Sequence, residues 1–71
     1  MYYVLVVKYP QEPWVNEFGD HDKEAVEFER QDIKDSHQTP RGTKYKILRL
    51  KNCRRGVVEK AVEELNNPSE Q

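Results

Sequence analysis

The sequence has a single cysteine, Cys53, so no disulfide can form within the chain. Small secreted domains commonly depend on several disulfides, and this absence argues against that class. Long apolar runs are also lacking. The apolar run over residues 2–7 is much shorter than a membrane-spanning helix, and it lacks the basic region that begins a secretory signal. These absences predict a protein of a reducing compartment, the cytoplasm, with no membrane partner.

Apolar residues are few as well. They make up 35% of the 71 residues, charged residues make up another 35%, and the mean hydropathy is -1.06. A chain of this length has room for one domain with a small core, and its net charge of -1 keeps self-repulsion low. We therefore expect one marginally stable α+β domain over residues 1–67 and a disordered polar tail over residues 68–71. A homodimer, or a partner that covers apolar surface, would add stability.

Recognisable catalytic and metal-binding motifs are missing. The three glycines are scattered and form no phosphate-binding loop. Asp20, His21 and Asp22 are adjacent, so they point in different directions, and the paired spacings of zinc sites do not occur. Neither histidine lies near Cys53 in the sequence, and we expect this cysteine to be a buried or half-buried structural residue. The sequence therefore predicts a protein that is not an enzyme, with no catalytic residue, metal, cofactor or small-molecule substrate.

Two segments in the first half of the chain are expected to be regular. Residues 2–9 are β-branched and aromatic, which predicts a strand, and its two apolar faces predict a central or doubly covered position. Residues 21–36 are expected to form a helix capped by Asp20 or Asp22, with a short strand over residues 26–29 as the alternative. The apolar residues of this helix fall in one broad arc: Ala25, Val26, Phe28 and Ile33.

The connector over residues 10–20 has proline and glycine near its ends. Pro13 and Gly19 predict one helical turn, with proline at its start and glycine past its end. Trp14 and Phe18 are four residues apart and would share one face of that turn. We expect Phe18 to enter the core, whereas Trp14 is a candidate either for the core or for a partner surface.

The second half of the chain predicts one strand and one helix. Residues 43–51 alternate as a strand does, and the alternation slips at residues 47–48, where a bulge would fit. Residues 53–66 carry a clear helical stripe, with Asn52 as the expected N-cap. The stripe consists of Val57, Val58, Ala61, Val62 and Leu65.

These elements give the order β-α-β-α, an α+β domain whose short two- or three-stranded sheet is packed by two helices. If the two strands pair directly, the helix between them favours a parallel arrangement. Two strands make a poor sheet, so either the connector supplies a third strand or two copies join their sheet edges. The second option is favoured, because the outer face of the first strand is too apolar to be left exposed.

Charge is strongly segregated along the chain. Residues 11–36 contain nine acidic and three basic residues, whereas residues 41–55 contain seven basic residues and no acid. The acidic segment is either a solvated helix face or a surface that docks on a basic partner. The basic segment is either a strip that binds anions or an exposed edge whose charges pair with acids of the first helix. The basic residues are Arg41, Lys44, Lys46, Arg49, Lys51, Arg54 and Arg55.

The favoured hypothesis is a small non-catalytic binding module that docks on a protein partner or on its own copy. Candidate docking residues are Trp14, Glu24, Glu27 and Asp35, together with the seven basic residues. The alternative is a nucleic-acid-binding protein that uses the basic segment, with Tyr45 stacked on a base. The pI of about 6.1 counts against this alternative. Salt dependence separates the two, because phosphate binding weakens steeply as salt rises.

Overall fold

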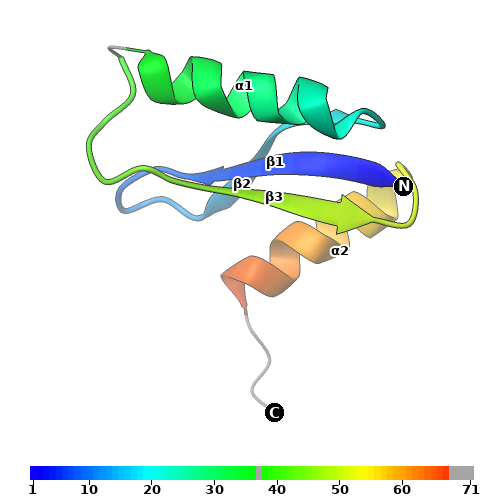
Figure 1. Ribbon diagram of the computed structural model, residues 1–71. Coiled ribbons are helices and arrows are strands. Elements are labelled where there is room, and N and C mark those ends of the chain that lie inside the picture. The colour runs from blue at the N-terminus through cyan, green and yellow to red at the C-terminus, as the bar shows by residue number, and fades with distance from the viewer. Residues whose placement is uncertain (37, 68–71) are drawn as a thin grey trace.

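The central strand β1 (Tyr2–Lys8) organises the fold. Residues 4–7 of this strand have no exposed surface. Successive side chains of a strand point to opposite faces, so an apolar run of this kind must be covered on both sides. In the computed structural model, which describes residues 1–36 and 38–67, β1 lies between β2 (Trp14–Asp20) and β3 (Lys44–Leu50) (Figure 1). The expected tail over residues 68–71 lies outside the described residues.

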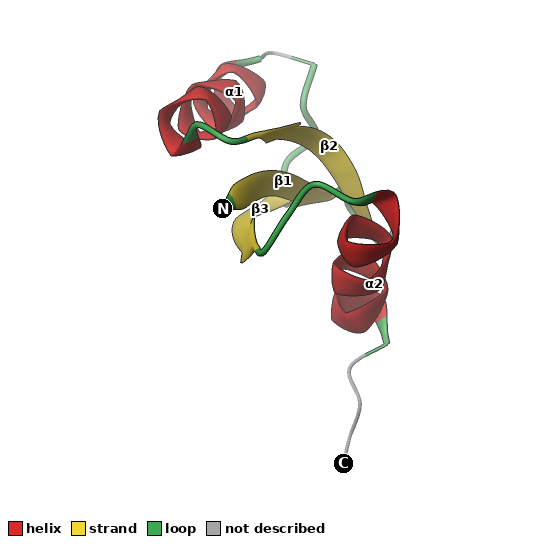
Figure 2. Cartoon of the chain, turned by 90° about the vertical axis from the view of Figure 1, so that its right-hand side faces the viewer, coloured by secondary structure: helices red, strands yellow, loops and turns green. Residues whose placement is uncertain are grey.

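Each face of the sheet is covered by one helix. α1 (Lys23–Asp35) lies on one side and α2 (Arg55–Asn66) lies on the other, which gives three layers (Figures 1 and 2). On the α1 side, Val26 packs with Leu5 and Val7 of β1. On the α2 side, Val58 packs with Val4 and Val6. The protein therefore has two small cores, one on each face of a single sheet. Within the described residues, neither helix is long and apolar enough to cross a membrane.

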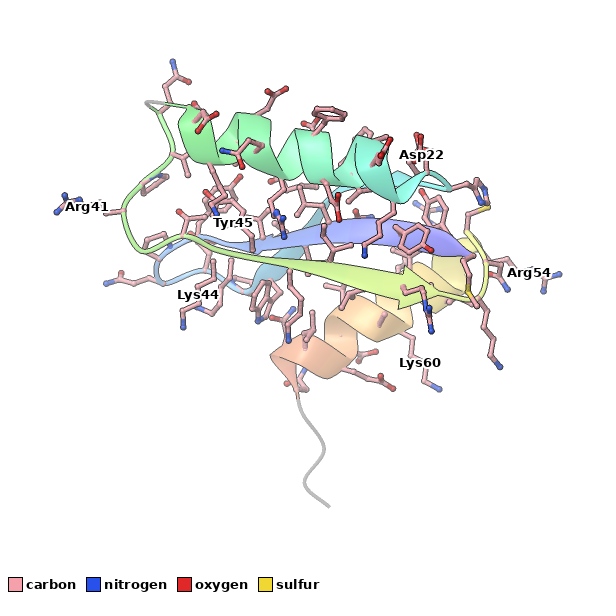
Figure 3. All side chains as sticks on the ribbon, viewed as in Figure 1. Asp22, Arg41, Lys44, Tyr45, Arg54 and Lys60 are labelled. Atoms are coloured by element: carbon pink, nitrogen blue, oxygen red, sulfur yellow. The ribbon has the colours of Figure 1, made fainter. Side chains whose placement is uncertain are left out.

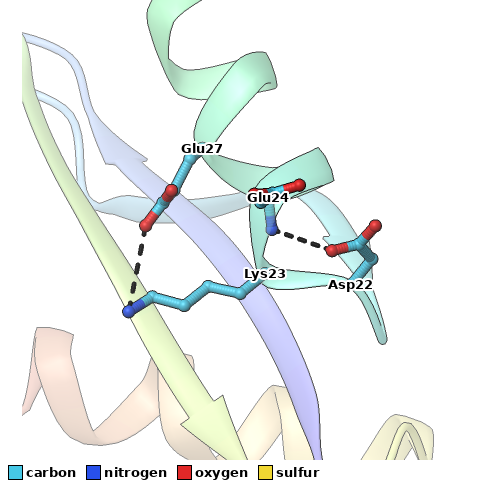
Figure 4. Close-up of polar contacts among 4 residues, drawn as sticks. All are labelled: Asp22, Lys23, Glu24 and Glu27. Atoms are coloured by element: carbon cyan, nitrogen blue, oxygen red, sulfur yellow. Dashed lines mark hydrogen bonds and ion pairs between the residues drawn. The ribbon is translucent and has the colours of Figure 1, made fainter.

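Most of the expected elements are confirmed. The chain forms a small α+β fold in which the predicted strands and helices follow in the predicted order, with β2 as a further strand. Residues 23–35 form a helix, so the alternative of a short strand over residues 26–29 is wrong. Asp22 is the N-cap of α1, because its Oδ1 accepts a hydrogen bond of 3.0 Å from the backbone N–H of Glu24 (Figure 4).

The connector is the main correction. It contains the strand β2 where a helical turn was expected, and it supplies the third strand of the sheet within one chain. The prediction of parallel pairing between β1 and β3 is also wrong, because both neighbours of β1 run antiparallel to it. The two outer strands are therefore parallel to one another, and α1 crosses over β1 to connect them. The apolar outer face of β1 is covered by α2, which removes the reason for expecting a second copy there.

A β-bulge in β2 explains why the connector was misread. The register pairs Leu5 with Phe18 and Val6 with Asn16, which leaves Glu17 without a partner on β1. The bulge reverses the alternation of the strand, so Trp14 packs in the α2 core and Phe18 packs in the α1 core. The expectation that both rings share one face is wrong, whereas the core position of Phe18 is confirmed.

β3 shows the opposite behaviour. It pairs with β1 over residues 44–50 without any shift in register, so the bulge expected at residues 47–48 is absent. Ile47 and Leu48 break the apolar-polar alternation because they enter different cores, Ile47 on the α1 side and Leu48 on the α2 side. A strand that is packed on both faces has no reason to alternate.

Three smaller expectations are also corrected. Phe28, placed in the buried arc of the helix, is 72% exposed on the outer side of α1. The N-cap of α2 is Arg54, two residues later than the expected Asn52, and the Oδ1 of Asn52 accepts a 3.0 Å hydrogen bond from the backbone N–H of Arg54. Cys53 is exposed, because it lies in the short loop that precedes α2 and packs against neither core.

We expect Leu5→Ala to lower the free energy of unfolding by about 2–5 kcal/mol, or to unfold the domain, because it opens a cavity under α1. The exposed ring of Phe28 provides the control, and Phe28→Ala should change stability by no more than about 0.5 kcal/mol. Urea denaturation followed by circular dichroism measures both variants. Equal losses for the two variants would contradict the assigned core.

The bulge also affects the ionisation of Tyr9, whose hydroxyl donates a 2.9 Å hydrogen bond to Oε2 of Glu17. Burial, followed by this hydrogen bond and the charge of the carboxylate, raises the pKa of Tyr9. Protonated Tyr9 therefore stabilises the fold below the ordinary tyrosine pKa, and this contribution is lost as the pH rises through the raised value.

We expect Glu17→Gln to lower the pKa of Tyr9 towards the ordinary value, because the substitution removes the neighbouring negative charge. Burial remains, so part of the rise should persist. An NMR titration of the tyrosine ring carbons at alkaline pH measures the change, with Glu12→Gln as the matched control. An unchanged Tyr9 titration in the Glu17 variant would exclude the contact.

Candidate functional site

The open edge of the sheet at β3 carries most of the basic segment. β3 has β1 on one side and no strand among the described residues on the other. Arg41 and Lys44 lie near one end of this edge, and Arg54 lies beyond the other end (Figure 3). The pairing with β1 places Lys46 on the α2 face and Arg49 on the α1 face. The seven predicted basic residues thus extend along and beyond β3, which makes this edge electropositive.

α1 adds basic residues to the same edge. Lys23 and Arg30 line a hollow between α1 and β3, and the Nζ of Lys34 lies 5.7 Å from the ring centroid of Tyr45. All three bases of the acidic segment therefore face β3. The hollow is lined by Tyr3, Lys23, Glu27, Arg30, Ile47 and Arg49. Glu27 is its one acidic residue, so the hollow carries a net positive charge.

The ion pairs of the described residues stay within the helices. Nζ of Lys23 lies 3.8 Å from Oε2 of Glu27 (Figure 4), and Nε of Arg55 lies 3.3 Å from Oε2 of Glu59. Across residues 1–36 and 38–67, no ion pair joins β3 to an acid of α1. The interpretation in which the first helix neutralises the basic segment is therefore not supported by the contacts.

Arg30 has an unusual environment within this hollow. Its Nε is buried and has no hydrogen-bond acceptor in the described part of the chain. A buried donor without an acceptor costs about 1–3 kcal/mol, and more when the group is charged. A carboxylate in the hollow beside Arg30 and Arg49 would form charge-assisted hydrogen bonds with guanidinium N–H groups that line it.

The aromatic rings near β3 are packed against the two cores and have lysine side chains over them. Tyr45 is half-buried against the α1 core, with Lys34 over its ring. Trp14 is half-buried against the α2 core, and the Nζ of Lys46 lies 5.9 Å from its ring centroid. The nucleic-acid alternative expects Tyr45 to stack on a base. With one side of its ring packed against the core and Lys34 over the ring, Tyr45 does not present a free face for that contact.

The acidic docking residues do not form one site with Trp14. Trp14 packs on the α2 side of the sheet, whereas Glu24, Glu27 and Asp35 belong to α1 on the opposite side. Glu24 and Glu27 border a shallow hollow beside the exposed ring of Phe28. Asp35 accepts a 3.0 Å hydrogen bond from the side-chain amide of Gln31. Glu27 and Arg30 line both this shallow hollow and the basic hollow, so the acidic outer face of α1 adjoins the basic edge at β3.

An apolar groove accompanies β3 on its other face. It lies between β3 and α2, where Leu48 and Leu50 face Ala61 and Leu65. Arg49 and Glu64 also line it. β3 is therefore bordered by a basic hollow on the α1 face and by an apolar groove on the α2 face.

Metal-binding and nucleophilic groups do not converge in the described residues. Within residues 1–36 and 38–67, no group of three or more His, Cys, Asp or Glu side chains is placed to hold a metal ion. His21 packs edge-on against the ring of Tyr2, with 5.0 Å between the centroids, and its Nδ1 lies 3.1 Å from the backbone oxygen of Met1. These contacts give His21 a structural role at the start of β1.

No protein-family model matches the chain, and comparisons with curated proteins and with solved structures find no significant match. The geometry of the basic surface along β3 is therefore what indicates a function. Sequence reasoning grouped the seven bases of residues 41–55 as one basic segment but missed the contribution of α1. The signal was present, because spacings of seven and four residues place Lys23, Arg30 and Lys34 on one side of a helix.

We expect Arg30→Met to leave the free energy of unfolding unchanged or to raise it by up to about 1–3 kcal/mol. Methionine keeps an unbranched apolar stem and removes the buried donor that lacks an acceptor in the described residues. Arg55→Met is the control, because the loss of its exposed pair with Glu59 should cost about 0.3–0.5 kcal/mol. Thermal denaturation compares the variants, and a clear destabilisation by Arg30→Met would show that its guanidinium is satisfied.

Proposed function

We propose that this protein is a small non-catalytic binding module that docks on an acidic surface of a protein partner. The docking surface is the basic edge, defined as β3 with its flanking basic residues and the three bases of α1. One observation carries the proposal. Bases from two separate segments of the chain converge on this edge, and within the described residues no ion pair joins β3 to the acids of α1.

A protein partner is favoured over nucleic acid for three reasons. Tyr45 and Trp14 are packed in the cores and covered by lysines, so the rings near the edge offer no stacking surface. The groove between β3 and α2 is apolar, which suits side chains of a polypeptide better than phosphates. The nine acids of residues 11–36 would also repel a long polyanion that extends past the edge.

A separate partner is favoured over a second copy bound at the same edge. In a symmetric dimer the same surface meets itself, so β3 against β3 would bring two sets of like charges together. Docking of the basic edge on the acidic face of another copy would join different surfaces, and such contacts form open chains unless they close into a ring. Because Cys53 is exposed, we also expect a reducing compartment such as the cytoplasm, where the free thiol is retained.

The charge-reversal variant Lys44→Glu tests the proposal. An oligoglutamate peptide, titrated at low salt and followed by amide NMR, is expected to shift the signals of β3. Lys44→Glu should weaken binding about fivefold, because an attraction of up to about 1 kcal/mol is replaced by a repulsion. Lys60→Glu makes the same charge change on the exposed surface of α2 (Figure 3) and should have little effect.

A single-stranded oligonucleotide of matching charge forms the second arm of the experiment. We expect it to bind no more tightly than oligoglutamate and to be released as salt approaches the physiological level. Tighter binding of the oligonucleotide, with a salt slope reduced by about one in the Lys44 variant, would favour the nucleic-acid alternative. If oligoglutamate shifts no signals of β3 at low salt, the proposal is wrong.

A further inference from the structure

The two edges of the sheet differ in whether their outward backbone N–H and C=O groups are hydrogen-bonded by a side chain or left open. At the β2 edge, the backbone N–H of Trp14 donates to Oδ1 of Asn66 at 2.7 Å, and Nδ2 of Asn66 donates to the Trp14 carbonyl at 3.1 Å. The side-chain amide of α2 thus takes the place of a neighbouring strand. The bulge at Glu17 distorts the same edge further along. Bulges and covering groups are the usual means by which an edge strand is prevented from pairing.

The β3 edge has neither device. Its register with β1 is continuous over all seven residues, so its outward backbone groups form a regular row. In the described part of the chain, no side chain makes a hydrogen bond to the backbone of residues 44–50. Its protection against pairing is charge alone, from Lys44, Lys46 and Arg49. Charge repels another basic strand and attracts an acidic one, so this protection is selective.

We propose that an extended acidic segment of the partner pairs antiparallel with β3 as a fourth strand of the sheet. This inference rests on the proposed function and specifies the mode by which the acidic partner binds. Strand addition derives its affinity from main-chain hydrogen bonds and its specificity from alternate side chains. The two faces of β3 therefore determine which side chains the added strand carries.

The α2 face of β3 sets one half of this pattern. Lys44 and Lys46 occupy its first two positions, and Leu48 and Leu50 occupy the next two. Directly opposed side chains of neighbouring strands lie close enough to interact. Acids of the added strand face the lysines, and its apolar side chains face the leucines. The apolar side chains enter the groove that Ala61 and Leu65 border.

The α1 face sets the other half. Arg49 lies on this face at the hollow that also contains Arg30, whose buried Nε lacks an acceptor in the described residues. An acid opposite Arg49 would place its carboxylate at this hollow, beside the guanidinium groups of Arg30 and Arg49. Short polar or β-branched side chains suit the positions opposite Tyr45 and Ile47. In antiparallel order, the complementary heptapeptide is Val-Glu-Val-Thr-Glu-Thr-Glu, which faces residues 50 to 44.

This heptapeptide, with blocked termini, is the probe for the first test. The peptide is titrated into the unsubstituted protein, and NMR gives the affinity of the peptide. A permuted peptide of the same composition, Glu-Glu-Glu-Thr-Thr-Val-Val, is the control. We expect the alternating peptide to bind about tenfold more tightly, because the permuted one cannot match acids to lysines and apolar residues to the groove. Hydrogen exchange of alternate β3 amides should slow when the alternating peptide binds and stay unchanged with the permuted one.

Backbone methylation of the probe tests strand pairing directly. Two versions of the heptapeptide carry N-methyl groups on alternate residues, one set on the amides that face β3 and the other on the amides that face away. We expect the first version to lose at least about tenfold in affinity and the second to retain its affinity, since alternate amides point to opposite sides of a strand.

The arms separate this inference from the proposed function. If the alternating and permuted peptides bind equally at β3 and both methylated versions bind as well as the unmethylated peptide, the partner docks by charge alone. The proposed function then stands and strand addition is wrong. If no acidic peptide binds at β3, both are wrong.

Discussion

The apolar character of β1 on both faces is the constraint on which the rest of the structure depends. Residues 4–7 are completely buried, so each side of the central strand needs its own cover. A chain of 71 residues provides only two helices of useful length in its described part, and each is committed to one face. No helix remains to cover an edge of the sheet. The edges must therefore be protected by local means, and this requirement links the core to the surface.

The two edges meet the requirement in different ways, and the difference produces the candidate site. At β2, a bulge and the amide of Asn66 remove the regular row of free backbone groups. At β3, basic side chains from the strand and from α1 leave that row intact but surround it with positive charge. The bulge and Asn66 hinder strand pairing at β2 whatever the charge of the incoming strand. The basic side chains at β3 hinder pairing only with strands that are also basic. In the proposed binding mode, the charges that protect this edge from pairing also select an acidic partner.

Elements whose signal is local could be predicted from the sequence, whereas features set by tertiary contacts could not. The helical stripe of α2, the β-branched run of β1 and the capping role of Asp22 are local. β2 was misread because the bulge at Glu17 breaks its alternation, while Pro13 and Gly19 resemble the ends of a helical turn. Counting charges along the chain did not distinguish the sides of α1, which hid that its three bases lie on the side that faces β3.

The position of Arg30 strengthens the assignment of the basic edge. A small domain with two thin cores has little stability to spare, and a buried guanidinium nitrogen without an acceptor lowers it further. Sequences generally agree with local physical rules except at functional sites, where stability is given up for binding. Here the buried Nε of Arg30, which lacks an acceptor in the described residues, lies at the hollow that Arg49 also lines. This hollow adjoins β3, the edge strand whose backbone is regular and open. In the proposed binding mode, a carboxylate in this hollow would offset the mutual repulsion of Lys23, Arg30 and Arg49, and because it binds the folded protein it would also raise stability.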